Sequence, residues 1–214
     1  MTIRRFVFNM LEVNTYVLAD EESREAVVID AACMSQSECL ALDKYITDNR
    51  LQPKHLLNTH LHFDHIFGNR HIYEHYGLKT EASAYDEDWL VEAPKRTRMF
   101  GLSFPGHPVA IGRYLNEGDT VTFGQCTLQC LAVPGHSRGS LVFHSIGEKC
   151  IFSGDALFKR SIGRTDLPGG DHQTLLQSIR EKLLVLPDET IVYPGHGDCT
   201  TIGEEKRSNW FLTC

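Results

Sequence analysis

The segment NTHLHFDHIFGN, residues 58–69, combines a dense group of metal-binding side chains with a short apolar run. The metal-binding side chains are His60, His62, Asp64 and His65. Buried imidazoles without a metal ion would each need a hydrogen-bond partner, because burying an unpaired polar group is costly. The segment therefore predicts a metal site. Ile66 and Phe67 would anchor the following helix and keep bulk water away from the ions.

The spacing inside this segment favours two ions over one. His60 and His62 share a face if the chain is extended, because side chains alternate across a strand. A turn into a helix would then bring Asp64 and His65 inward as a separate pair. Two such pairs divide more easily between neighbouring ions than they fit around a single one.

Three later runs repeat one pattern, in which an apolar strand ends in a tight turn that leads to His or Asp. The runs are VPGH at 133–136, FSGD at 152–155 and YPGH at 193–196. Side chains at strand ends can converge while rigid backbone holds them. We therefore add His136, Asp155 and His196 to the predicted ligands. Asp155 taken alone could equally be a turn aspartate.

The seven ligands suggest both the metals and their chemistry. Three imidazoles would hold one ion, Asp64 with two imidazoles would hold the other, and one carboxylate would be free to bridge. We expect two divalent cations, with zinc as the first choice, although a site without thiolate also suits iron or manganese. Two ions about 3.5–4 Å apart can supply hydroxide near neutral pH from a shared water.

The other histidines are expected to have structural roles, because an isolated His is more often a surface or hydrogen-bonded residue than a ligand. They are His55, His71, His75, His107, His144 and His172.

Composition narrows the class of protein. The 214 residues, 42% hydrophobic and 23% charged, predict a single globular domain spanning 1–214. The net charge of −7 provides no basic field, so we expect neither nucleic acid nor a membrane as a partner. No stretch approaches the roughly 18 apolar residues of a membrane span. The pattern does not predict an oligomeric state.

The cysteines point to a reducing compartment. Seven are present, an odd number without any CxxC pair, which argues against a disulfide framework or a thiolate zinc site. A cytoplasmic location is the simplest expectation.

Strand and helix patterns alternate along the chain. Ser35 with Glu38 forms a capping box for a helix over 35–50. Further helices are predicted over 64–76, which ends at Gly77, and over 83–93 before Pro94. Residues 94–112 carry three prolines and three glycines, and we predict a long loop there. The remaining predicted helix covers 171–186, after a glycine-rich loop at 159–170.

Short β-branched or aromatic runs mark the strands in both halves. They lie at 3–9, 15–20, 26–30, 55–58, 113–115, 119–123, 126–133, 140–146, 150–153 and 190–193. Strand groups interspersed with amphipathic helices predict an α/β fold in which two sheets face each other with helices outside.

The motif THLHFDH resembles the THxHxDH signature of the metallo-β-lactamase-fold hydrolases, and the later ligands follow in the order that this superfamily uses. The resemblance implies an αββα four-layer sandwich of two mixed β-sheets flanked by helices, with the site at one edge of the sheets. It covers nearly the whole chain.

The resemblance also implies roles for individual residues. One metal would be held by His60, His62 and His136. The second would be held by Asp64, His65 and His196. Asp155 would bridge the two ions, and Asp64 and Asp155 would be the catalytic carboxylates. Asp30, Thr59 and Asp166 are expected to support these ligands from behind.

Three segments further resemble the small, single-domain group of type II glyoxalase-like proteins. They are MFGL at 99–102, IGRTDLPGGD at 162–171 and TTIGEEKRSNWFL at 200–212. Those enzymes hydrolyse thioesters such as S-D-lactoylglutathione. We expect no counterpart of the C-terminal helical domain that supplies much of the glutathione pocket in larger glyoxalases, so the thiol carrier stays open.

The resulting hypothesis is metal-assisted hydrolysis of a small-molecule thioester by a metal-bridging hydroxide oriented by Asp155. A thiolate leaves without a dedicated general acid. Arg164, in the glycine-rich loop, is either the anchor for a carboxylate of the thiol carrier or the structural partner of Asp166. The sequence favours neither role over the other.

Several alternatives share the same ligands. A persulfide dioxygenase of this fold uses one iron, and its loop usually reads Cys-Gly-Arg where this chain has Ile162 before Gly163. A lactonase needs the same ions. A β-lactamase is disfavoured because the zinc-thiolate classes place Cys at the position of Asp155, and a nuclease is disfavoured by the acidic charge. A binding module with a structural metal would instead show a closed site without turnover.

Overall fold

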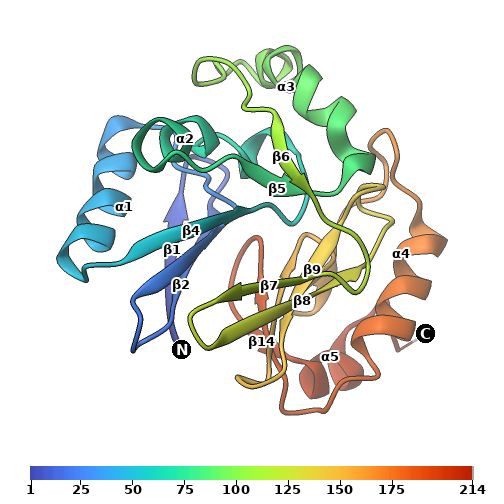
Figure 1. Ribbon diagram of the computed structural model, residues 1–214. Helices are drawn as coiled ribbons and strands as arrows, with labels where there is room; N and C mark the ends of the chain where they lie inside the picture. Colours follow the sequence, from blue (N-terminus) through green and yellow to red (C-terminus); the bar gives the residue numbers. More distant parts are fainter. Residues whose placement is uncertain (214) are drawn as a thin grey trace.

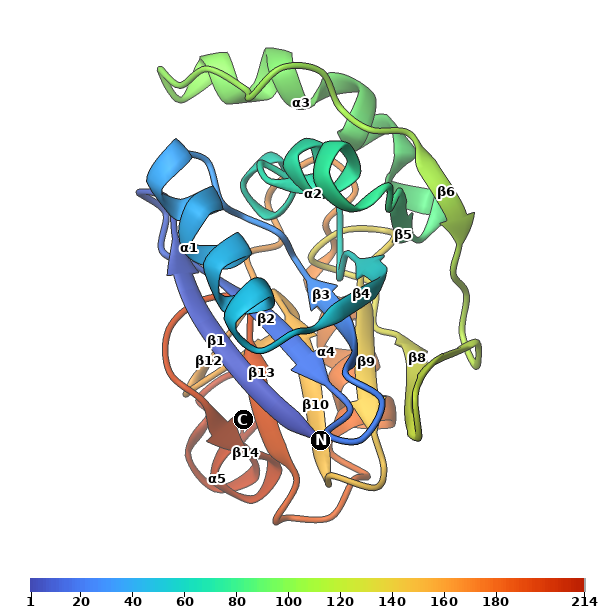
Figure 2. The same ribbon diagram turned by 60° about the vertical axis from the view of Figure 1, so that its left-hand side comes forward.

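The computed structural model describes residues 1–213 and contains two six-stranded sheets packed face to face (Figure 1). The helices α1 and α2 cover the outside of the first sheet, and α4 and α5 lie on the outer side of the second (Figure 2). The predicted αββα sandwich of two mixed sheets is therefore confirmed.

The first sheet has the strand order β1-β2-β3-β4-β5-β6. Its strands are β1 (Thr2–Phe8), β2 (Val13–Ala19), β3 (Glu25–Ile29), β4 (Gln52–Leu57), β5 (Thr80–Ala82) and β6 (Ile111–Tyr114). The first three are antiparallel neighbours, and β3 to β6 are parallel. The ends of β3 and β4 therefore emerge at one edge of the sheet.

The second sheet has the order β14-β13-β10-β9-β8-β7. Its strands are β7 (Thr120–Phe123), β8 (Cys126–Ala132), β9 (Leu141–Ser145), β10 (Cys150–Gly154), β13 (Ile191–Pro194) and β14 (Thr200–Thr201). The pair β10–β13 is parallel, so the residues that follow these two strands lie side by side. A small hairpin of β11 (Leu157–Phe158) and β12 (Ser161–Ile162) enters the segment predicted to be only a glycine-rich loop.

Aromatic side chains from both sheets fill the space between them. Tyr16 of β2 packs edge to face on Phe152 of β10, with ring centroids 5.2 Å apart, and Phe152 stacks on Tyr193 of β13 at 5.1 Å. The Tyr16 hydroxyl donates a hydrogen bond of 2.7 Å to the carbonyl of Pro194. Large apolar surfaces and one buried hydrogen bond thus fix the position of one sheet relative to the other.

The capping box predicted for α1 (Gln36–Asp48) is present, with the Ser35 hydroxyl accepting from the Glu38 backbone and the Glu38 carboxylate accepting from Ser35. The helix α4 (His172–Ser178) begins at Asp171 and continues into a π-helical turn, Ile179–Leu183, which together account for the helix predicted over 171–186. The last helix is α5 (Ile202–Ser208).

The helix predicted over 64–76 was wrong at its start. Residues Phe63–His65 form a short 3₁₀ turn, η1, and α2 covers only Asn69–Tyr76. It ends at Gly77, as predicted, where φ is 72°. The interruption lies at Gly68, whose backbone N–H donates to the Ala31 carbonyl at 2.7 Å. This contact between two loops takes precedence over the local helical pattern.

The boundary predicted at Pro94 was also wrong. After a 3₁₀ turn, η2 (Ala84–Asp86), the helix α3 runs from Glu87 to Met99 and passes through Pro94. Proline in a helix interior removes one hydrogen bond. The helix continues because Leu90, Ala93 and Thr97 on one side are buried, so burial offsets the lost bond. The predicted loop over 94–112 is therefore shorter, because residues 94–99 belong to α3 and residues 111–112 to β6.

No helix among residues 1–213 has the length and apolar character needed to cross a membrane.

Gly68 offers a test of this packing. A Cβ atom on Gly68 would overlap the Cys33 Sγ and lie 2.9 Å from the Ala31 carbonyl oxygen. We expect Gly68→Ala to lower the free energy of unfolding by about 1–3 kcal/mol through overpacking. Urea denaturation monitored by circular dichroism measures the change. Gly147→Ala is the matched control, because a Cβ there meets nothing within 4 Å. Equal midpoints for the two variants would contradict the role of the Gly68 contact.

Candidate metal centre

The structure brings all seven predicted ligands to one place, at the ends of strands from both sheets. His60 and His62 follow β4, Asp64 and His65 lie in η1, and the other three follow β8, β10 and β13. Their ligand atoms form three overlapping groups, in each of which every atom lies within 4.8 Å of the others. These are His60 with His62 and His136; Asp64 with His65 and His196; and His60 with His65 and Asp155.

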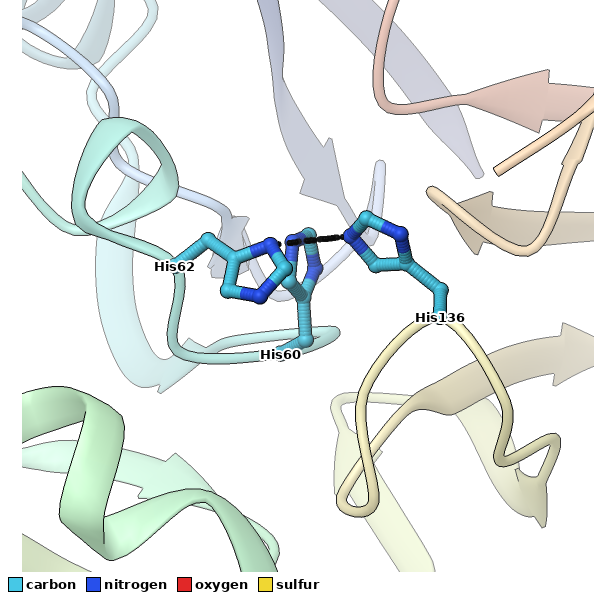
Figure 3. A group of neighbouring side chains, drawn as sticks. All are labelled: His60, His62 and His136. Atoms are coloured by element: carbon cyan, nitrogen blue, oxygen red, sulfur yellow. Dashed lines mark hydrogen bonds between the residues drawn. The ribbon is translucent and has the colours of Figure 1, made fainter. Parts of the chain in front are cut away.

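The first group consists of three buried imidazoles that point toward one another (Figure 3). His136 Nε2 lies 2.9 Å from His62 Nδ1 and 3.3 Å from His60 Nε2. His60 and His62 come from the motif segment, whereas His136 comes from the loop after β8. Three nitrogen atoms from two loops therefore meet at a single point.

The second group adds a carboxylate to two imidazoles. His196 Nε2 lies 3.3 Å from His65 Nε2 and 3.6 Å from Asp64 Oδ2. Asp155 lies between the groups, with Oδ2 3.7 Å from His136 Nε2 and Oδ1 3.4 Å from His65 Nε2. Asp155 therefore lies within reach of imidazoles from both groups.

Hydrogen bonds behind four of the five imidazoles determine which nitrogen carries the proton, whereas His62 Nε2 has no such partner among the described residues. His136 Nδ1 lies 2.8 Å from the carbonyl of Arg164, and His196 Nδ1 lies 2.9 Å from the carbonyl of Leu11. A carbonyl only accepts, so in each ring Nδ1 carries the proton. In the neutral ring Nε2 is then a bare lone pair directed into the cluster, as a metal ligand requires.

Asp30 performs the same task for two further rings. Its Oδ2 accepts from His65 Nδ1 at 3.0 Å and from the Thr59 hydroxyl at 2.7 Å. Since Thr59 Oγ1 donates to Asp30, it accepts from His60 Nδ1 at 3.1 Å. Asp30 itself adopts φ of 50°, a strained conformation for this residue that the surrounding bonds maintain. The supporting positions proposed for Asp30 and Thr59 fit these contacts.

The electrostatics of the cluster suit a cation. Burial, reinforced by neighbouring imidazoles, lowers the pKa of His62 to about 3 and that of His60 well below its ordinary value, so both rings are neutral. At His65, burial lowers the pKa, but carboxylates led by Asp155 and Asp64 more than compensate and raise it well above the usual range. Those carboxylates need a positive charge, which a metal ion would supply.

One carboxylate oxygen makes no hydrogen bond, although it lies 3.4 Å from His65 Nε2. Among the described residues, the buried Asp155 Oδ1 accepts no hydrogen bond. Buried carboxylate oxygens are normally paired, and leaving one unpaired is costly. Together with the bare imidazole nitrogens, this atom provides a donor set that fits divalent metal ions.

Two glycines leave room for the ligands. A Cβ on Gly163 would lie 3.0 Å from His136 Nδ1 and overlap the Asp155 backbone carbonyl. A Cβ on Gly195 would lie 2.8 Å from the His65 ring and overlap the Asp155 carboxylate. Gly163 and Gly195 are therefore needed because other segments of the same chain approach them so closely.

The two predicted residues of the glycine-rich loop, Arg164 and Asp166, pair with each other. Arg164 and Asp166 form a bidentate ion pair, Nε–Oδ1 and Nη2–Oδ2 both at 2.8 Å, with side chains 55% and 68% exposed. This pairing lowers the pKa of Asp166 to about 2. The structure therefore places Asp166 at the surface, whereas Arg164 contributes its carbonyl to His136 and borders the cavity above the cluster.

The cluster opens into a cavity of about 490 Å³ with a largely apolar wall. The wall includes Leu11, Phe63, Trp89, Met99, Phe100 and Leu167. Trp89 and Arg96 of α3 border this cavity but were not predicted from the sequence. Their spacing of seven residues, which places both on one helix face, was the available signal, but the predicted end of the helix at Pro94 hid it.

Comparison with known proteins identifies the family. The model of the metallo-beta-lactamase superfamily matches residues 9–196. The chain belongs to this superfamily. The fold of the superfamily binds divalent metals, in agreement with the cluster of histidines and aspartates.

Individual relatives bear different names. The chain is similar to the hydroxyacylglutathione hydrolase GloC of Haemophilus influenzae, with 37% identity over 99% of this chain and 98% of that protein. It is also 32% identical to the mitochondrial persulfide dioxygenase ETHE1 of Bos taurus, over 93% of this chain and 71% of the relative.

Two solved structures of similar proteins align with all or nearly all of this chain. The B3 metallo-beta-lactamase BLEG-1 has a TM-score of 0.87 at 35% identity, with 100% of both chains covered. The protein TTHA1623 in a di-iron-bound form has a TM-score of 0.86 at 37% identity, with 98% of this chain and 100% of that chain covered.

The Asp30 contacts generate a prediction about metal binding. We expect Asp30→Asn to weaken metal affinity about 10- to 100-fold, because an amide is a poorer acceptor and no longer raises the basicity of His65. Titration with a competing chromophoric chelator measures the affinity. Asp198→Asn, at an exposed position of the same charge, serves as the control. An Asp30 variant that retains the affinity of the control would refute this role.

Proposed function

We propose that the protein is a two-metal hydrolase of small-molecule thioesters, similar in activity to the hydroxyacylglutathione hydrolases. The observation that carries the proposal is the division of the seven side chains into two ligand groups that share Asp155. The di-iron form of TTHA1623 supports two ions, and the name of the GloC relative supports a thioester substrate.

The ions would be held by His60, His62 and His136 on one side and by Asp64, His65 and His196 on the other. We propose zinc, with iron or manganese also compatible with the nitrogen and oxygen donors. When bound, the ions would polarise the acyl carbonyl and lower the pKa of a water molecule so that it attacks near neutral pH.

The protein's own residues would orient the reactants. Asp155, between the two groups, would accept a hydrogen bond from the attacking water and direct it toward the acyl carbon. Asp64 would complete the second group from a position beside His196. The apolar wall formed by Phe63, Phe100 and neighbouring side chains would exclude bulk water and receive the acyl group. A thiolate leaving group needs no further acid.

Arg164 remains the proposed anchor for a carboxylate of the thiol carrier. It borders the cavity next to His136 and Asp155, and Asp166 holds its guanidinium in a fixed orientation. Preorganisation of this kind favours bidentate binding of a carboxylate. We further propose a single domain acting in the cytoplasm.

Metal removal tests the proposed function. We expect metal-loaded protein to contain two ions per chain and to hydrolyse S-D-lactoylglutathione, because the attacking water is activated by the ions. Dialysis against a chelator should abolish turnover, and added zinc, iron or manganese should restore it. Release of free thiol and metal content per chain are the measurements. Turnover that persists without metal would contradict the mechanism.

The second candidate is a persulfide dioxygenase, favoured by the similarity to ETHE1. Its signature would be one iron per chain and oxygen uptake with glutathione persulfide. The complete second ligand group of Asp64, His65 and His196 argues for two ions in this chain. A sample with one iron, oxygen uptake and no thioester turnover would replace our proposal with this alternative.

The role of Arg164 has its own test. We expect Arg164→Ala to raise KM for S-D-lactoylglutathione at least 10-fold while kcat changes less than threefold, because a ground-state carboxylate contact is lost. Steady-state kinetics on metal-loaded protein provide both constants. Asp198→Asn serves again as the control. An unchanged KM would leave Arg164 with only its structural pairing to Asp166.

A further inference from the structure

A second cavity adjoins the one above the cluster. Its volume is about 410 Å³, and it shares Trp89, Arg96 and Pro168 with the larger cavity. It lies between α3 and the loop that follows Asp166, and none of its lining residues belongs to the proposed metal site. The two cavities therefore adjoin each other at Trp89, Arg96 and Pro168.

Arg96 is held rigidly at this division. Its guanidinium carbon lies 3.7 Å from the centroid of the Trp89 ring, and one Nη atom contacts the Glu92 carboxylate at 2.6 Å. The side chain is only 22% exposed. Stacking on an aromatic ring, together with an ion pair one helical turn away, fixes the plane of the guanidinium.

One donor of Arg96 is unused. Its Nε is buried and has no hydrogen-bond partner among the described residues. A buried guanidinium N–H is normally paired, since leaving it unpaired costs free energy. Arg96, which borders both cavities, thus retains unused donor capacity for an oxygen acceptor of a ligand.

The position of Arg96 is tied to the histidine cluster through Trp89. The Trp89 ring packs on the His62 ring, with centroids 4.2 Å apart and planes 67° apart. Trp89 itself is only 7% exposed. A group bound at Arg96 would therefore lie at a defined distance from a bond cleaved beside His62.

We infer that Arg96, supported by Trp89, is the binding site for a carboxylate of the thiol carrier. This inference rests on the proposed function and adds the residue that binds the carrier. The acyl group lies in the larger cavity, and the carrier extends past Trp89 into the smaller one. Arg164 borders only the larger of these two cavities. Arg96 therefore engages a different carboxylate from the one assigned to Arg164.

The other charged residues of the smaller cavity indicate which kind of thiol carrier would fit there. Arg138 is a second cation there, and Asp88 and Glu92 are anions. This mixture complements a carrier that bears an ammonium group as well as carboxylates. It disfavours a carrier with phosphate groups alone, because the two acids would repel it. A small peptide thiol with a zwitterionic end fits both conditions.

The test uses binding, so that it does not depend on turnover. The chain has two tryptophans, Trp89 and Trp210, and Trp210 is 78% exposed. In metal-loaded Trp210→Phe protein, Trp89 fluorescence alone reports on the site. We expect S-methylglutathione, a thioether that cannot be hydrolysed, to change this fluorescence with a measurable Kd. Arg96→Ala should raise that Kd at least 10-fold, and Arg96→Lys should restore only part of the affinity, since it keeps the charge but loses the fork.

Arg98→Ala is the matched control, because Arg98 is exposed on the same helix and its loss changes the charge equally. A Kd within twofold of the parent for Arg98→Ala, with the loss confined to Arg96, supports the site. Equal Kd values for parent and Arg96→Ala, or no binding by the parent, overturn it.

Kinetics separate this result from the proposed function. With S-D-lactoylglutathione, Arg96→Ala should raise KM at least 10-fold and leave kcat within threefold, whereas KM for S-lactoyl-N-acetylcysteamine, a neutral carrier, should not change. Absence of turnover of both thioesters by the parent would refute the thioesterase proposal while leaving the binding result to decide the carboxylate site.

Discussion

The structure depends on one constraint, which is that imidazole nitrogens and carboxylate oxygens must face one another inside the protein. Four rings direct Nε2 into the cluster because their Nδ1 protons are held by oxygen acceptors behind them. The acceptors are the Arg164 and Leu11 carbonyls, the Thr59 hydroxyl and the Asp30 carboxylate. Lone pairs at distances near 3 Å repel unless a proton or a cation lies between them. The fold therefore maintains an arrangement that is unfavourable by itself and that a metal ion makes favourable.

The two sheets provide the rigidity that this arrangement requires. Parallel pairing of β3 with β4 brings Asp30 next to the motif segment, and parallel pairing of β10 with β13 brings Asp155 next to His196. The aromatic core around Tyr16 and Phe152 then holds one sheet edge against the other. Because cores resist small displacements, the ligand positions are determined by packing far from the ligands themselves.

Local signals in the sequence were sufficient for the fold class and for gathering the ligands. The capping box at Ser35, the glycine at the end of α2 and the His and Asp residues after strands were all interpretable from neighbouring residues alone. The start of α2 and the course of α3 were not. Gly68 interrupts a helical pattern to contact Ala31, and burial of one side of α3 outweighs Pro94. Both depend on partners remote in sequence, which periodicity does not contain.

The same distinction separates chemistry from specificity. Relatives over 30% identical bear the names hydroxyacylglutathione hydrolase, persulfide dioxygenase and B3 metallo-beta-lactamase, so family membership alone does not choose the substrate. The part of the site that can distinguish substrates is the wall above the cluster, to which α3 contributes Trp89, Arg96 and Met99. These side chains belong to no metal-binding motif, and their importance follows only from where the helix lies. Part of the substrate choice in this protein is therefore expected to reside in α3, which the motif neither contains nor predicts.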